Sequence, residues 1–332
     1  MKSKRNAVLE GAKAAADLHR ELKLRNHVQS HRSSIDVFGI IVQRRIPLLF
    51  RPLDGLLGAY LPEPGIIVTT QRPLSIQRWT GAHELGHAVM HHRVSLDDES
   101  MLNRLASRLP HYEPTEIAAD SFATHFLLPK WLFALQAERH GWSRKDLVDP
   151  VIVYQMGLRA GASYRATCMA LARHNLVAEN TLTSLLQVEL KTLKRQLLAG
   201  YELENWHPDV WLLTEADEGT VIEGDSSDAF IMRLREHSGS GYLWDIGDLR
   251  AGGFVVFRDQ RNDNGSELEM GGAGERELGA RPGDSRLGRI DLRQVRPWQE
   301  NGEPISRLSF TFDLRGKERG RPRAERRSLV AA

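Results

Sequence analysis

The stretch GAHELGHAVMHH, residues 81–92, decides how the first half of this sequence folds. His83 and His87 lie four residues apart, and positions i and i+4 share one face of an α-helix. Two imidazoles at that separation can bind one cation. Glu84 occupies a neighbouring position, from which a carboxylate reaches a reacting water without being a ligand. The pattern predicts a metal-binding helix, and the alternative is an ordinary buried helix rich in histidine.

The chain has 332 residues, of which 41% are hydrophobic and 27% are charged, as expected of one or two globular domains. A net charge of +2 is too small for a dedicated nucleic-acid-binding protein. The single cysteine, Cys168, excludes an intramolecular disulfide and a cysteine-based zinc site. No apolar run has the length of a signal peptide or a membrane span, so we expect a soluble cytoplasmic protein without membrane contact.

Short elements precede the metal-binding helix. Residues 6–25 have the alanine-rich pattern of a helix, and residues 33–45 predict a second helix capped at Ser33 or Ser34. Three short strands separated by the turns PLDG and PEPG are predicted at 46–52, 56–62 and 66–70. The last of them, IIVTT, is either a sheet edge to which an extended peptide can add or an ordinary paired strand.

A third ligand is expected downstream, because catalytic zinc has three protein ligands and one open position. PTEIAADSFATHFLLP predicts a helix from about Pro114 to Leu128, with proline at its first position and again after its end. Glu116 and Asp120 share a face of this helix. We assign Glu116 as the third ligand and Asp120 as the acceptor of a ligand histidine's ring N–H. The alternative for Asp120 is an exposed helix aspartate.

Three segments resemble the ImmA/IrrE family of zinc metallopeptidases: IDVFGIIVQRRIPLLFRPLDGLLGAYLPEPGIIVTT, AHELGHAVMHH and EIAADSFATHFLLP. The similarity extends over about residues 33–175, in the family's order and spacing. It implies an α+β fold with a thermolysin-like minimal gluzincin domain, and one Zn²⁺ per chain bound by His83, His87 and Glu116, with Glu84 as the base. It also implies a protein substrate, a helix-turn-helix repressor whose cleavage switches on stress, mobile-element or phage-defence genes.

The segment that follows, residues 144–177, contains two helical stretches around a Gly-Ala-Ser turn. Arg159, Arg165 and Arg173 accompany them, so the segment is either a DNA-reading helix-turn-helix or a unit packed on the peptidase through its apolar residues. We expect Cys168 to be a core residue and nucleic-acid binding to be weak. Periodic leucines in residues 181–200 predict a connecting helix.

After residue 200 the hydrophobic period becomes that of strands. FIMRL, GYLWDI, GGFVVF and RLSFTFDL predict strands, and Leu308, Phe310, Phe312 and Leu314 share one face. Glycine-rich residues 263–285 predict a long loop. SGSGYLW (238–244), GGAGE (271–275) and RPW (296–298) resemble the three binding loops of the chagasin-like inhibitors. This resemblance implies an all-β, immunoglobulin-like sandwich for protein recognition or regulation.

Three aromatic residues of these loops, Tyr242, Trp244 and Trp298, are either partner-binding anchors or core residues. The predicted organisation is an N-terminal helix, a peptidase domain, a helical extension with a connector, a sandwich and a disordered basic tail, at residues 1–32, 33–143, 144–200, 201–315 and 316–332.

The predicted chemistry is metal-assisted peptide hydrolysis, in which Glu84 takes a proton from the attacking water and returns it to the leaving amine. Candidates for oxyanion or substrate contacts are His91, which continues the histidine stripe of its helix, and His111 and Tyr112. The alternative function is a DNA-binding regulator with a structural zinc. Glu84 argues against that alternative, because structural zinc has no use for a base.

Overall fold

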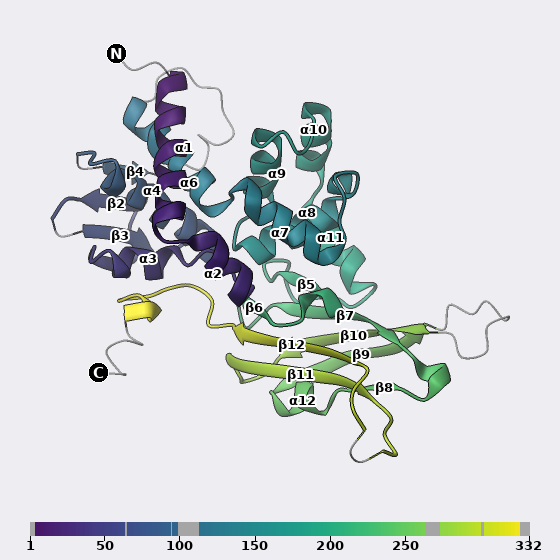
Figure 1. The fold of residues 1–332 in the computed structure, drawn as a ribbon. Helices are drawn as coiled ribbons and strands as arrows, with labels where there is room; N and C mark the ends of the chain where they lie inside the picture. Colours follow the sequence, from purple (N-terminus) through teal and green to yellow (C-terminus); the bar gives the residue numbers. More distant parts are fainter. Residues whose placement is uncertain are drawn as a thin grey trace.

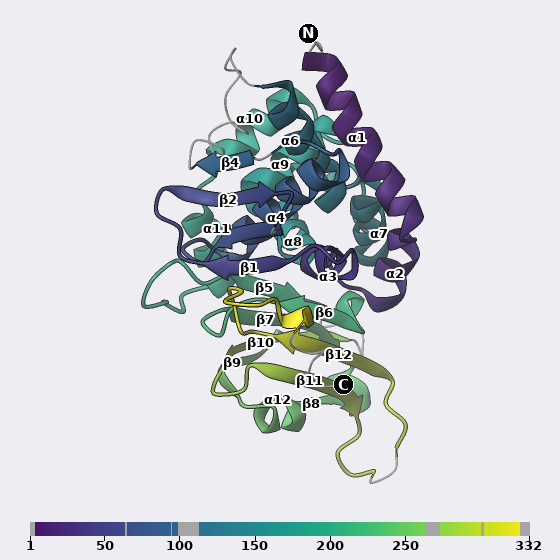
Figure 2. The same cartoon turned by 90° about the vertical axis from the view of Figure 1, so that its left-hand side faces the viewer.

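The computed structural model of this chain describes residues 4–63, 65–93, 95–98, 113–262, 273–299 and 302–325. His111 and Tyr112 therefore lie outside the described residues. Helices and a small sheet form one half of the molecule, and a β-sandwich forms the other (Figures 1 and 2). No described helix combines the length and the apolarity that spanning a bilayer requires.

The small sheet has the order β1-β3-β2-β4. Its strands are β1 (Leu48–Arg51), β2 (Leu56–Leu61), β3 (Gly65–Thr69) and β4 (Ser95–Asp98). The three strands predicted before the metal-binding helix are thus confirmed. Of the two alternatives for IIVTT, the paired strand is confirmed and the sheet edge is excluded, because β3 pairs with β1 on one side and with β2 on the other. Among the described strands, β1 and β4 lie at the edges.

Five helices build the rest of the first half: α1 (Lys4–Glu21), α2 (Leu24–His31), α3 (Val37–Gln43), α4 (Leu74–Val89) and α6 (Pro114–Leu127). The N-terminal region is thus two helices where one was predicted. Asp36 caps α3 by accepting the Gly39 N–H at 2.9 Å, so the predicted cap at Ser33 or Ser34 is wrong. The Ser34 hydroxyl instead donates to Glu223 of the sandwich.

Helix α4 packs between the small sheet and α6, and α1 covers the other side of α6. Helices α1 and α6 approach closely because α1 has a glycine at the contact: a Cβ on Gly11 would lie 2.0 Å from the carbonyl oxygen of Ala118. Alanines on α6 complete this small-residue contact. The helix predicted over 114–128 is confirmed and is held firmly on both sides.

The extension contains α7 (Lys130–His140), α8 (Pro150–Ala160), α9 (Tyr164–Arg173), α10 (Glu179–Gln187) and α11 (Leu190–Leu198). The predicted single connecting helix is therefore two. The chain takes extended backbone angles at Val188 and Glu189. This break lets α11 pack its leucines on β5 of the sandwich.

Helix α8 is a packing element. Its Arg159 is buried and donates through two nitrogens to both carboxylate oxygens of Asp217, each at 2.8 Å. Gln155 bonds the main chain of Val210 and Leu212, and Tyr154 donates to Asp209. Helix α8 is therefore a packed element, but these contacts are polar and are made with the sandwich, not with the peptidase through apolar residues as predicted.

Cys168 on α9 is fully buried, and burial raises the pKa of its thiol to about 11. A thiol with so high a pKa is not a nucleophile at neutral pH. The predicted core role of Cys168 is confirmed.

Two four-stranded sheets of order β5-β7-β10-β9 and β6-β12-β11-β8 face each other in the second half. Their strands are β5 (Val210–Leu213), β6 (Thr220–Glu223), β7 (Ala229–Glu236), β8 (Leu243–Asp245), β9 (Phe254–Asn262), β10 (Gly274–Pro282), β11 (Leu287–Val295) and β12 (Ser306–Asp313). The predicted apolar face of β12 is confirmed, since Leu308, Phe310, Phe312 and Leu314 are all buried in the sandwich core.

The predicted loop at 263–285 is wrong for β10, which is a central strand between β7 and β9. Its sequence, GERELGARP, lacks the alternation of apolar residues typical of a strand, and its charged side chains are paired. Buried Arg276 binds Asp259 at 2.8 Å and the carbonyl of Trp244 at 2.6 Å, while Glu277 binds Arg258 at 2.8 Å. Cross-strand ion pairs here replace the apolar alternation that predicts strands.

The three aromatics of the predicted binding loops separate into core and surface. Trp244 is buried and donates its indole N–H to the Arg235 carbonyl. Trp298 is 67% exposed, and its ring lies against Gly241. Tyr242 is half-buried and lies under the guanidinium of Arg296, 4.5 Å from its ring centroid. The core interpretation therefore holds for Trp244 and not for Trp298.

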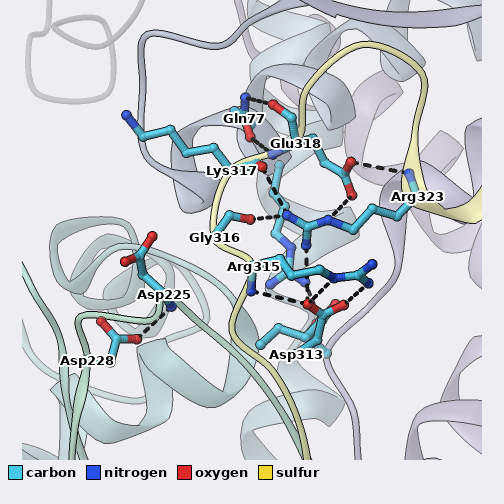
Figure 3. A network of polar contacts seen from close by, with 12 residues as sticks. Gln77, Asp225, Asp228, Asp313, Arg315, Gly316, Lys317, Glu318 and Arg323 are labelled. Carbon is cyan, nitrogen blue, oxygen red and sulfur yellow. Dashed lines mark hydrogen bonds and ion pairs between the residues drawn. The ribbon is translucent and has the colours of Figure 1, made fainter. Parts of the chain in front are cut away.

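After β12 the chain returns to the first half, and we name residues 314–325 the strap (Figure 3). Gly320 exchanges two main-chain hydrogen bonds with Phe50 of β1, at 2.8 and 2.9 Å. Gln77 of α4 binds both the N–H and the carbonyl of Glu318, at 2.8 and 3.1 Å. The predicted disordered tail is therefore wrong for residues 316–325, because the hydrogen bonds to Phe50 and Gln77 and the ion pair of Arg323 with Asp313 of β12 fix them to the protein.

Replacing Gln77 with leucine should lower the free energy of unfolding by about 3 kcal/mol, because buried main-chain groups of Thr69 and Glu318 would lose their partner. Denaturant unfolding measures this change. Gln71→Leu, the same substitution at an exposed position, is the control and should change little. Equal stabilities of the two variants would contradict the assigned role of Gln77.

Acid should destabilise the protein through His140, whose pKa is lowered to about 4 by burial and, next, by the charge of Arg159. Its side chain is 4% exposed and lies 3.5 Å from Asp217. Below pH 6.5 the unfolded chain takes up a proton that the folded chain does not, so stability is lost as the pH falls from 6.5 towards 4.

Between pH 6.5 and 4.5 the free energy of unfolding should fall in both proteins, and the fall should be about 2 kcal/mol smaller in His140→Gln than in the wild type. Chemical denaturation at the two pH values measures the difference, with exposed His27→Gln as the control. An unchanged pH dependence in His140→Gln would show that the imidazole is not kept neutral in the fold.

Candidate metal centre

The HExxH helix, α4, is buried along most of its length. Residues 77–87 are all buried, and His83, Glu84 and His87 are at most 1% exposed. Glycines set the distances to its neighbours: a Cβ on Gly86 would lie 3.0 Å from Phe122 of α6, and one on Gly58 of β2 would lie 2.4 Å from Thr80. The motif is therefore packed closely between sheet and helix.

The three predicted ligands come together. His83 Nε2 lies 2.9 Å from His87 Nε2 and 3.3 Å from Glu116 Oε2, and His87 Nε2 lies 3.6 Å from Glu116 Oε1. Zinc with bonds of about 2.05 Å to tetrahedral ligands separates its donor atoms by about 3.3 Å. Two imidazole nitrogens and one carboxylate oxygen at these separations fit such an ion.

Glu84 projects from the same helix towards the small sheet, since its Oε1 lies 3.0 Å from the position of a Cβ on Gly58. It does not belong to the group of donor atoms formed by His83, His87 and Glu116. Glu84 is thus a buried carboxylate next to His83 along the helix and outside the donor group.

This region is similar to a known family. Residues 44–173 match the Peptidase_M78 family, the IrrE N-terminal-like domain. The matched IrrE N-terminal-like region begins before β1 and ends with α9, so it includes α4, α6 and all three predicted ligands. The resemblance predicted from the sequence is confirmed for this part of the chain. A peptidase family with a His-His-Glu cluster supports a metal-dependent peptidase.

Two solved structures are similar to about a third of this chain. The cysteine protease inhibitor EhICP2 from Entamoeba histolytica is 22% identical, with a TM-score of 0.28, over 33% of this chain and 98% of the inhibitor. Amebosin is 19% identical, with a TM-score of 0.23, over 32% of this chain and 97% of its own. No curated protein matches this sequence.

Asp120 lies where the sequence predicts it within the IrrE N-terminal-like region. Its Oδ1 is 2.9 Å from His83 Nδ1, and its side chain is 21% exposed. The two atoms are close enough for an ion pair, and Nε2 of the same ring faces the other donor atoms. The alternative, an aspartate on an exposed helix face, does not describe this position.

His91 lies away from the donor atoms, so the prediction that it continues the stripe of His83 and His87 is wrong. Helix α4 ends at Val89, and His91 is exposed with a left-handed backbone, φ 55°. The next residue, His92, lies against the cluster instead, with Nδ1 3.0 Å from His87 Nδ1. Sequence reasoning missed His92 because helical geometry was extended past the end of the helix.

Replacing Asp120 with alanine should weaken zinc binding about 10- to 100-fold, because the His83 ring would lose its anchor. Competition with a chelator of known affinity measures the change. Asp120→Asn keeps an acceptor oxygen, so its zinc affinity should fall less than that of Asp120→Ala. Wild-type affinity in Asp120→Ala would exclude Asp120 from the support of the site.

Proposed function

We propose that this chain is a zinc-dependent endopeptidase that cleaves a protein substrate. The observation that carries the proposal is the convergence of the His83, His87 and Glu116 donor atoms within 4.8 Å of one another, beside buried Glu84. Three protein ligands leave room for a water or substrate, as in catalytic zinc sites. The match to a peptidase family over residues 44–173 supports the same conclusion.

His83 and His87 would hold the ion through their Nε2 atoms, and Glu116 through its carboxylate. When bound, zinc supplies Lewis-acid polarisation of the scissile carbonyl and lowers the pKa of a water. Glu84 accepts the proton of the attacking water and donates it to the leaving amine.

Strand β4 is the edge at which we expect an extended substrate to add. The predicted site for such pairing, β3, is already paired on both sides, whereas β4 pairs only with β2 among the described strands. Helix α4 packs on β2, so a peptide along β4 lies near the HExxH helix. Main-chain pairing at a sheet edge gives affinity with little demand on substrate sequence.

We propose a helix-turn-helix repressor as the substrate, on the basis of the family resemblance, and the sandwich as the element that recognises a protein or regulates cleavage. Two of its predicted binding segments lie side by side: Arg296 donates to the Ser240 carbonyl at 3.2 Å, and Trp298 covers Gly241. An exposed tryptophan and a tyrosine stacked by arginine are typical of protein-binding surfaces.

The alternative, a DNA-binding regulator with structural zinc, has weaker support. In the described part of the chain no fourth histidine, cysteine or carboxylate joins the three donor atoms, whereas a structural zinc has four protein ligands. Of the three arginines expected to read DNA, Arg159 is buried against the sandwich, while Arg165 and Arg173 are exposed.

The variant Glu84→Gln should keep zinc and lose cleavage by at least about 100-fold, because it removes a proton acceptor and no ligand. Glu116→Ala should lose the metal. Zinc content is measured on the purified full-length chain, and cleavage is measured by mass spectrometry with a helix-turn-helix repressor encoded beside it and with an unstructured peptide.

Cleavage of the repressor by Glu84→Gln at the wild-type rate would overturn the proposed base. Cleavage of the peptide but not of the repressor would retain the peptidase and reject the repressor as its substrate. A wild type that binds no zinc would overturn the proposed function.

A further inference from the structure

The turn that ends α4 has a specific geometry. The His91 N–H donates to the Ala88 carbonyl at 3.3 Å, and the His92 N–H donates to the His87 carbonyl at 2.9 Å. These two hydrogen bonds, together with the left-handed backbone of His91, form the Schellman motif. Glycine usually occupies the left-handed position, where this chain has His91.

A Schellman motif brings the residue after the left-handed position back onto the last turn of its helix. Here it places His92 on His87. The two rings meet edge to face, with centroids 5.0 Å apart and an interplanar angle of 70°. The Nδ1 atoms of the two rings are 3.0 Å apart, within hydrogen-bond distance.

Together with a metal on Nε2 of His87, this contact would assign the protons of both rings. His87 Nε2 lies among the proposed donor atoms, 2.9 Å from His83 Nε2, so it must be unprotonated to bind a metal. A neutral His87 then carries its proton on Nδ1, and the hydrogen bond runs from His87 Nδ1–H to the lone pair of His92 Nδ1. The same logic applies to His83, whose Nδ1 faces Asp120.

We propose that His92 is a positioning residue, which holds the ring of His87 and fixes the tautomer that presents Nε2 to zinc. This inference rests on the proposed zinc site. Each ligand histidine would then have its own partner: a carboxylate from α6 for His83, and an imidazole from the end of α4 for His87. Loss of a partner of this kind commonly weakens metal affinity about 10- to 100-fold.

Three variants of the full-length chain test the proposal. His92→Phe keeps an aromatic ring of similar size and removes the acceptor. His92→Asn places an amide oxygen at about the distance of Nδ1 from the backbone and restores an acceptor. His91→Gly is the matched control, because glycine suits the left-handed position and the exposed His91 side chain does not face the cluster.

The zinc dissociation constant, measured by chelator competition, should rise about 10- to 100-fold in His92→Phe and should recover largely in His92→Asn. It should stay at the wild-type value in His91→Gly. The visible spectrum of bound Co²⁺ should change in His92→Phe and not in His91→Gly, because it reports the geometry of the ligand histidines. Melting temperatures of the zinc-free proteins show whether each variant folds.

Wild-type zinc affinity in a folded His92→Phe variant would overturn the assignment. It would also be overturned if His92→Asn bound zinc no more tightly than His92→Phe. These outcomes leave the peptidase proposal intact. Absence of zinc binding in the wild type would instead refute the proposed function itself, so the two failures are distinguishable.

Discussion

The burial of α4 is the constraint on which the rest of this structure depends. Residues 77–87 are buried without interruption although the segment contains glutamine, arginine, two histidines and a glutamate. A polar group without a partner in such surroundings costs about 1–3 kcal/mol, so each needs a partner from another element. The close contact of Gly86 with Phe122 brings α6 near enough to supply Glu116 and Asp120 to His83.

The N-terminal half of the same helix draws its partners from the second half of the chain. Gln77 binds the main chain of Glu318 in the strap, and Arg78 forms an ion pair with Glu223 of β6. Helices and sandwich also share one hydrophobic core, in which Val210, Ala229 and Ile231 meet the leucines of α11. The sandwich is therefore joined to the HExxH helix by buried polar and apolar contacts, not by a linker.

Much of the candidate site could be predicted from the sequence. The spacing of His83 and His87 places both on one helical face, and the spacing of Glu116 and Asp120 does the same on the second helix. The structure differs from the prediction at the end of a helix and where a segment pairs with another that is distant along the chain. The prediction placed His91 on the helical face of His83 and His87, but α4 ends at Val89. The residue that contacts His87 is His92.

The sequence by itself determined the helices α4 and α6, the first three strands and the proposed donor residues, because hydrophobic period, capping proline and i, i+4 spacing act over a few neighbouring residues. Only the tertiary structure decided that β3 is interior, that charged β10 is a central strand, and that the basic strap pairs with β1. Each of these depends on main-chain and ionic partners far away along the chain, and local sequence does not encode a distant partner. The place of His92 depends on how one helix ends, a choice made by hydrogen bonds of the turn and not by a periodic pattern.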